Sequence, residues 1–157
     1  MKKIWIALLL LTLAPSIIFA AGVVVPAPTV KDKCPVCGMF VSKYPAWLGS
    51  ISFKNGSPAY FDGPKDLFTY LLNLKKFAPG KSPAMITANQ VKDYYSLKSV
   101  DGRTAFYVIG SDVYGPMGKE LVPFEKQMDA QSFLRDHKGK KVLRFNEITP
   151  VVLKSLE

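Results

Sequence analysis

The stretch AWLGSISFKNGSPAYFDGPKDLFTYLL, residues 46–72, contains two strand patterns and a helix pattern in direct succession. Its first eight residues alternate well enough to predict a strand, Asn55-Gly56 is a typical hairpin turn, and PAYF returns as a second strand. Asp62 is expected to cap a helix that has Pro64 in its first turn. The apolar residues of this helix recur at helical spacing, at Leu67, Tyr70, Leu71 and Leu74. The stretch therefore predicts a β-hairpin that leads into a helix.

Residues 91–100 indicate a further strand, which ends the first half of the chain and turns at Asp101-Gly102 into a strand over 104–111. The second half begins with that strand and repeats the order of elements. A glycine-rich connection, the strand ELVPF, the helix DAQSFLRDH and the closing strand KVLRF follow, and a last helix is expected to begin at Thr149. The segments YFDGPKDLFTYLL and PFEKQMDAQSFLRDH share a strand ending in Phe, an acid directly after it, and a helix that carries Phe. We predict an α+β fold with two strand-strand-helix-strand modules, a pseudo-repeat in one compact domain.

The N-terminal residues 1–20 are typical of a signal peptide. Two lysines precede an apolar run from Ile4 to Leu13, and small residues surround Ala20. Cleavage there would leave an extended leader over 21–33 and a domain over 34–157, with modules of about 34–100 and 101–157. An uncleaved membrane anchor is the alternative, and no cysteine follows the run closely enough to be lipidated. The sequence therefore predicts a periplasmic protein, membrane-tethered if the leader is not cleaved.

The charge and the residue types restrict the function. The net charge is +9, and without residues 1–20 it is +7, from 19 basic and 12 acidic residues. The lysines are scattered, which favours a solvated surface, and export removes the chain from the nucleic acid of the cell, so nucleic acid is excluded as a partner. A single histidine and the absence of a Ser-His-Asp set give acid–base catalysis little to work with. We expect no catalytic activity.

The segment KDKCPVCGMF, residues 31–40, contains both cysteines of the chain. Covalent haem attachment is excluded, because Gly38 stands where His is required. A zinc site needs four ligands, and the cysteines supply two, so at least one carboxylate would have to join them even with His137. A redox dithiol normally begins a helix, but a Tyr-Pro break follows closely. A Cys34–Cys37 disulfide remains open in an oxidising compartment.

Copper(I) is the further candidate for this segment. The ion prefers thiolate and thioether ligands and accepts two or three of them. Cys37 and Met39 stand at i and i+2, so on an extended backbone both point to one side, and Gly38 leaves room between them. A third sulfur would come from Met85, Met117 or Met128, and Met117 is favoured because its GPMG loop shows no pattern that would bury it.

Taken together, the motifs of this chain resemble those of the NosL family of nitrous oxide reductase accessory proteins. The resemblance is carried by CPVCGMFVSKYP, FDGPKDLFTYLL, AFYVIGSDVYGPMGKELVPF and DAQSFLRDHKGKKVLRFNEITPVVL, which cover most of residues 34–153. It implies a periplasmic chaperone that binds Cu(I) and delivers it for nitrous oxide reductase assembly, together with a membrane transporter complex. The family's ligands carry over as Cys37, Met39 and Met117. Cys34 stays open as a fourth ligand, a resolving thiol or a structural residue.

Two rival functions remain beside this one. The first is a periplasmic thiol-disulfide oxidoreductase that uses the Cys34/Cys37 pair. The second is an interaction domain whose two cysteines form a disulfide. Many members of the family are lipoproteins, and the lack of a lipidated cysteine here leaves the mode of membrane association undecided.

Overall fold

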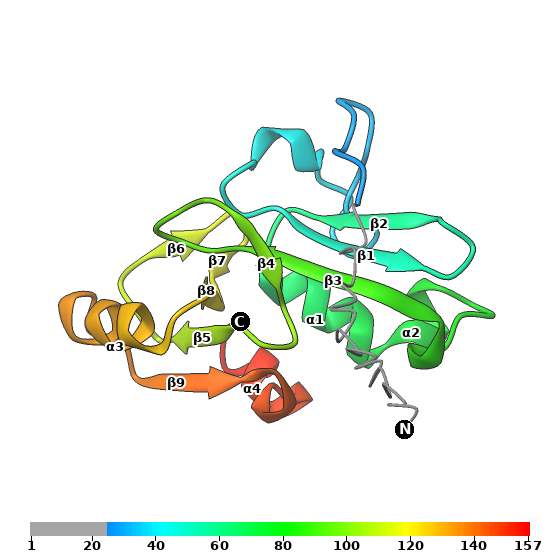
Figure 1. Ribbon diagram of the computed structural model, residues 1–157. Coiled ribbons are helices and arrows are strands. Elements are labelled where there is room, and N and C mark those ends of the chain that lie inside the picture. Colours follow the sequence, from blue (N-terminus) through cyan, green and yellow to red (C-terminus); the bar gives the residue numbers. More distant parts are fainter. Residues whose placement is uncertain (1–24) are drawn as a thin grey trace, which may run out of the picture.

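The first half of the chain folds as a strand-strand-helix-strand module, in a computed structural model that describes residues 25–157 (Figure 1). The hairpin turns at Gly56, whose φ of +78° is one that glycine adopts without strain. The predicted signal peptide over 1–20 lies outside the described residues. The elements are the 3-10 turn η1 (Val41–Lys43), β1 (Gly49–Phe53), β2 (Pro58–Phe61), α1 (Pro64–Leu72), α2 (Leu74–Phe77), the 3-10 turn η2 (Pro83–Met85), β3 (Ile86–Lys92) and β4 (Ser99–Asp101).

The second half repeats this order, with a small hairpin inserted between its first two strands. Thr149 caps the last helix by accepting a hydrogen bond from the backbone N–H of Val152, and Pro150 opens that helix, as predicted. The elements are β5 (Phe106–Ile109), β6 (Tyr114–Gly115), β7 (Gly118–Lys119), β8 (Val122–Phe124), α3 (Gln127–Asp136), β9 (Lys141–Arg144), the 3-10 turn η3 (Phe145–Glu147) and α4 (Pro150–Lys154).

The two antiparallel sheets have matching topologies. The first sheet has the strand order β2-β1-β3-β4, and the second has the order β8-β5-β9. In each sheet the first strand of the module is central: β1 lies between β2 and β3, and β5 lies between β8 and β9. The predicted α+β pseudo-repeat is therefore confirmed. Strands β6 and β7 pair only with each other.

The main hydrophobic core contains residues from both modules. Phe68 of α1 is 2% exposed, and its ring lies 5.1 Å from that of Tyr107 in β5 and 5.2 Å from that of Phe145 after β9. Such aromatic pairs contribute beyond the apolar area that they bury. Phe68 thus joins the two modules, and Cys34 is buried in the same core.

The strand predicted over 91–100 is shifted in the structure. Strand β3 begins earlier and ends at Lys92, and a turn separates it from β4. The turn forms because the buried Asp93 accepts hydrogen bonds at 2.7 Å from the backbone N–H groups of Ser96 and Glu125. Leu97 has a φ of 58°, which no strand contains. A side chain that bonds to nearby amides competes with the strand, and here it wins.

Asp93→Asn is expected to destabilise the fold at pH 7 by about 1–3 kcal/mol, because Asn replaces one accepting oxygen with a donor. Burial alone would raise the pKa of Asp93, but the N–H groups of Glu125 and Ser96 outweigh it and lower that pKa. The stabilisation is therefore present above the unfolded pKa, about 4, and is lost as the pH falls through the folded pKa. Urea unfolding at several pH values between 7 and 3 should show the difference shrinking. Asp136→Asn, at an exposed helical position, is the matched control, and an unchanged Asp93→Asn deficit at pH 3 would contradict this account.

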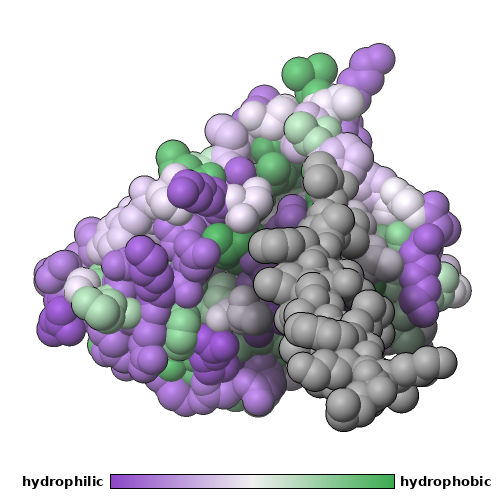
Figure 2. All heavy atoms as spheres, viewed as in Figure 1, coloured by the Kyte–Doolittle hydropathy of each residue, from purple (hydrophilic) through white to green (hydrophobic). Residues whose placement is uncertain are grey.

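The surface agrees with the prediction of solvated lysines. The face formed by α3 and β9 is predominantly hydrophilic (Figure 2). Ion pairs are few in residues 25–157, where only His137–Asp112 and Lys141–Glu147 are close enough. Across the same residues, no helix combines the length and the apolar composition needed to cross a membrane.

Candidate metal centre

Cys34 and Cys37 lie on a tight loop that is closed by backbone hydrogen bonds. Lys33 and Phe40 form an antiparallel bridge, and the Cys34 N–H donates to the Met39 carbonyl at 2.8 Å. Gly38 has a φ of +80°, so the backbone turns there and is not extended, which corrects the geometry assumed for Cys37 and Met39. The backbone N–H groups of Val36 and Cys37 act to lower the pKa of the Cys34 thiol, and the Met39 N–H acts to lower the pKa of the Cys37 thiol. These donors can stabilise thiolates bound to a metal.

Two carboxylates complete this site from the start of α1. The Cys34 thiol donates to Asp66 Oδ2 at 3.2 Å, and the Cys37 thiol donates to Asp62 Oδ1 at the same distance. The four ligand atoms all lie within 4.8 Å of one another. Asp62 is fully buried, and its Oδ2 is one of two buried side-chain polar atoms without a hydrogen-bond partner in residues 25–157. A buried oxygen without a partner beside two thiols is consistent with a cation site.

Both thiols are kept protonated by this environment. Burial, and then the nearby carboxylates of Asp66 and Asp62, raise the pKa of Cys37 to about 12. Burial is also the main cause that raises the pKa of Cys34 well above its usual range, with Asp62 and Asp66 adding to it. A bound cation would compensate the negative charge and take the place of the thiol protons.

The four residues could together hold a metal ion. Two sulfurs and two carboxylate oxygens are the donor number and donor types that tetrahedral zinc sites use. The predicted ligand set contained no carboxylate partner for the cysteines, because Asp62 was assigned to helix capping. In the structure Gly63 is the N-cap and Asp62 makes no capping bond, so that assignment is wrong.

The two predicted thioether donors belong to different segments, Met39 to the cysteine loop and Met117 to the β6–β7 hairpin. Met39 stands two residues after Cys37 and is half-buried. Met117 is 45% exposed and lies at the turn of the β6–β7 hairpin, a regular structure that its sequence did not predict. Its carbonyl accepts a hydrogen bond from the side chain of Lys65, which stands directly before Asp66. The hairpin backbone therefore contacts the first turn of α1, close in sequence to both carboxylates.

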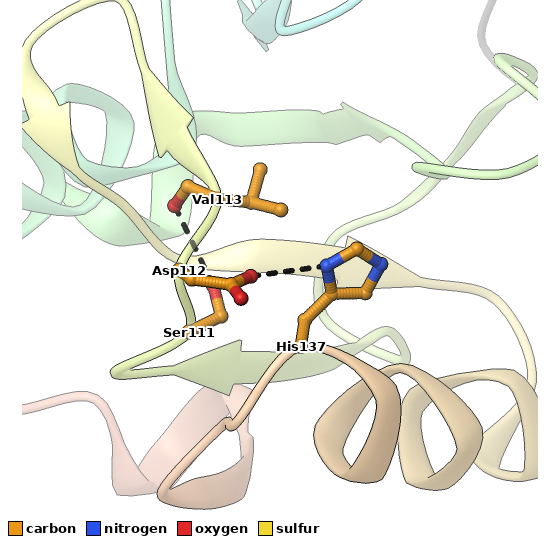
Figure 3. A network of polar contacts seen from close by, with 4 residues as sticks. All are labelled: Ser111, Asp112, Val113 and His137. Atoms are coloured by element: carbon orange, nitrogen blue, oxygen red, sulfur yellow. Dashed lines mark hydrogen bonds and ion pairs between the residues drawn. The ribbon is translucent and has the colours of Figure 1, made fainter.

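His137 is not part of this cluster. It follows the last residue of α3 in the second module, and its Nδ1 lies 3.1 Å from Asp112 Oδ1 (Figure 3). Its ring also stacks on that of Phe133. Ser111 next to the His137–Asp112 pair donates to the Val113 carbonyl.

Sequence reasoning missed Asp62 and Asp66 as members of the site. The one local signal is their spacing of four residues, which can place two side chains on the same side where a helix begins. The same spacing is common among surface acids. Only the contact with cysteines at sequence separations of 25 and 32 residues gives it meaning.

Known proteins resemble this chain over most of its length. The sequence model of the family described as NosL matches residues 25–153. The copper-binding lipoprotein NosL of Stutzerimonas stutzeri is 29% identical over 126 residues, 78% of this chain and 65% of that protein. The chain thus spans slightly less than two thirds of that relative. The crystal structure of the copper chaperone NosL from Shewanella denitrificans has a TM-score of 0.66 and 26% identity, and covers 81% of this chain and 98% of that one.

Proposed function

We propose that this chain, which belongs to the NosL family, is a periplasmic metallochaperone that binds copper(I) and delivers it for assembly of a copper enzyme. Nitrous oxide reductase is the acceptor that family membership favours, and a membrane transporter complex is the expected partner in assembly. The observation that carries the proposal is the pair of thiols beside Met39 on one loop. The Met117 carbonyl, in addition, accepts a hydrogen bond from Lys65, the residue before Asp66. The relatives named for copper binding and copper chaperone activity support it.

The proposed copper ligands are Cys37, Met39 and Met117, with Cys34 as a further thiol within reach of the first. Cys37 is half-buried and Met117 is exposed, whereas Cys34 is 2% exposed. Copper(I) is soft and tolerates low coordination, so sulfurs at the surface can bind it. Cys37 loses its proton on binding and supplies the negative charge, and the neutral thioethers complete the site.

An exposed, low-coordinate site suits transfer of the ion to an acceptor. The acceptor's ligands can approach from the Met117 side before the ligands of this chain leave. Copper then moves by ligand exchange and is not released as a free ion. The thioethers are uncharged, so they are the first ligands that an incoming thiolate or imidazole would displace.

The thiol environment argues against the oxidoreductase alternative. A redox dithiol needs a lowered thiol pKa, usually at a helix N-terminus. Here burial and the neighbouring carboxylates raise the pKa of Cys37 to about 12, and only the 3-10 turn η1 follows the loop. Metal-free protein should therefore be a poor thiol–disulfide exchange catalyst.

Met39→Leu and Met117→Leu are each expected to weaken copper(I) binding by about tenfold or more. Each removes one proposed sulfur donor, and the fold should stay intact because leucine is similar in size to methionine. Competition titration of the reduced protein with a copper(I) chelator measures this. Met128→Leu is the matched control, since Met128 is 79% exposed on α3 and outside the proposed ligand set. The magnitude follows from the tenfold to hundredfold losses that even supporting residues of metal sites produce. Unchanged affinity in the double Met39/Met117 variant would show that the proposed ligand set is wrong.

A further inference from the structure

The Met117 hairpin, residues 114–119, depends on other elements for its position. Its strands β6 and β7 have two residues each and pair with no other strand. An isolated two-stranded hairpin is marginally stable at best, even when it is longer than this. The turn is Pro116-Met117, followed by Gly118 with a φ of +88°. The hairpin therefore needs contacts outside itself if Met117 is to have a fixed place.

Lys65 supplies such contacts from the first turn of α1. Its ammonium group donates to the Met117 carbonyl at 2.8 Å and to the Lys119 carbonyl at 2.9 Å. The two carbonyls lie on either side of the Gly118 bend, so one side chain spans the turn. Charged donors make hydrogen bonds about twice as strong as neutral ones.

Glu120 joins the base of the hairpin to the same helix turn. It is 3% exposed, and its Oε1 accepts hydrogen bonds from the backbone N–H groups of Lys65 and Leu121. A Cβ at Gly115 would come within 2.9 Å of the Glu120 side chain, so the hairpin packs closely on it. Burial raises the pKa of Glu120 to about 8, although both N–H groups and the Lys65 charge oppose this. The contact is thus made mainly by hydrogen bonds at neutral pH.

The position of Lys65 in the sequence links this contact to the thiols. Asp66 follows it directly and accepts from Cys34, and Asp62 lies three residues before it and accepts from Cys37. Residues 62–66 therefore contact both parts of the proposed site. The two carboxylates bond to the thiols, and the Lys65 ammonium bonds to the backbone of the hairpin that carries Met117.

We propose that Lys65 is a positioning residue, which fixes the Met117 hairpin against α1 so that the Met117 thioether is presented to copper bound at Cys37. This inference rests on the proposed function, because it requires Met117 to be a copper ligand. Lys65 itself does not contact the metal in this proposal. Groups that orient ligands from behind typically account for 10- to 100-fold in metal affinity.

A double-mutant cycle of Lys65→Leu and Met117→Leu tests the proposal. Lys65→Leu should weaken copper(I) binding about tenfold or more in the otherwise unaltered chain, and should cause no further loss once Met117 is Leu. Binding exchanges the Cys37 thiol proton for the Cu(I) ion, so the charge of the site is unchanged and loss of the Lys65 charge by itself should alter the affinity little. Lys119→Leu is the matched control, because it also removes one positive charge but leaves the Lys119 backbone carbonyl that accepts from Lys65 in place. It should not weaken binding.

Two further measurements separate positioning from folding. Methyl NMR of methionine-labelled, metal-free protein should show the Met117 signal move toward its random-coil position in Lys65→Leu, with the Met85 signal unchanged. Lys65→Gln, whose shorter amide cannot span both carbonyls, should behave similarly, whereas Lys65→Arg should restore copper affinity. If Lys65→Leu fails to fold, the Gln and Arg variants decide the question.

The outcomes distinguish this inference from the proposed function. Unchanged affinity in Met117→Leu alone would overturn the ligand set on which the inference depends. A loss in Met117→Leu without any loss in Lys65→Leu would overturn the inference and leave the ligand set standing. An equal loss from Lys65→Leu in both backgrounds would show that Lys65 acts on copper independently of Met117, which also overturns the inference.

Discussion

Cys37→Ser is expected to lose tight copper(I) binding, with an affinity drop well beyond about 100-fold, the upper end of losses caused by supporting residues. Cys37 is the one donor in the proposed set that can bring a negative charge to a half-exposed site. Serine keeps the size and the hydrogen bond to Asp62 but offers a hard oxygen that does not ionise. The fold should persist, because the side chain is not fully buried.

Competition titration under reducing conditions measures the Cys37→Ser effect, with circular dichroism as the check on folding. Cys34→Ser, measured in parallel, addresses the second thiol. A loss similar to that of Cys37→Ser would assign Cys34 to the metal, whereas lower stability with near-normal affinity would assign it to the core in which it is buried. Retention of copper affinity within tenfold in Cys37→Ser would refute the thiolate-centred site.

Phe68→Ala is expected to destabilise the fold by about 3–5 kcal/mol, a large fraction of the stability of an ordinary domain. The 2% exposed ring packs on Tyr107 and Phe145 of the other module, so its removal leaves a cavity between the two halves. Because one core spans both modules, they should unfold in a single transition in the parent chain and in the variant.

Urea unfolding followed by far-UV circular dichroism and by tryptophan fluorescence tests this expectation. Leu72→Ala on the same helix is the matched control, since Leu72 is 43% exposed and should cost much less. A loss below about 1 kcal/mol in Phe68→Ala, or separate transitions for the two probes, would contradict the picture of one shared core.

Much of the fold was predictable because its signals are local. The Asn55-Gly56 turn, the Pro64 helix start and the Thr149-Pro150 helix start each depend on residues within a few positions of one another. The strand predicted over 91–100 was wrong, because the Asp93 carboxylate bonds to an amide 32 residues away in sequence. Apolar pattern alone carries no information about that contact.

The site was predictable only as a set of sulfurs. The types and spacing of Cys34, Cys37 and Met39 make a soft metal a candidate, beside the disulfide and redox alternatives that the same residues allow. Asp62 was assigned to helix capping and Lys65 was not singled out, because acids and lysines at helix starts are usually surface residues. Their roles depend on what packs against the first turn of α1.

The sequence by itself determined two strand-strand-helix-strand modules and the thiols and thioethers available to a metal, since hydrophobic period, turn residues and side-chain chemistry are properties of contiguous residues. The tertiary structure decided which groups meet: Asp66 with Cys34 across 32 residues, and Lys65 with Met117 across 52. These contacts follow from the packing of both modules around the main core. Contacts between residues so far apart in sequence are fixed by the joint burial of many side chains.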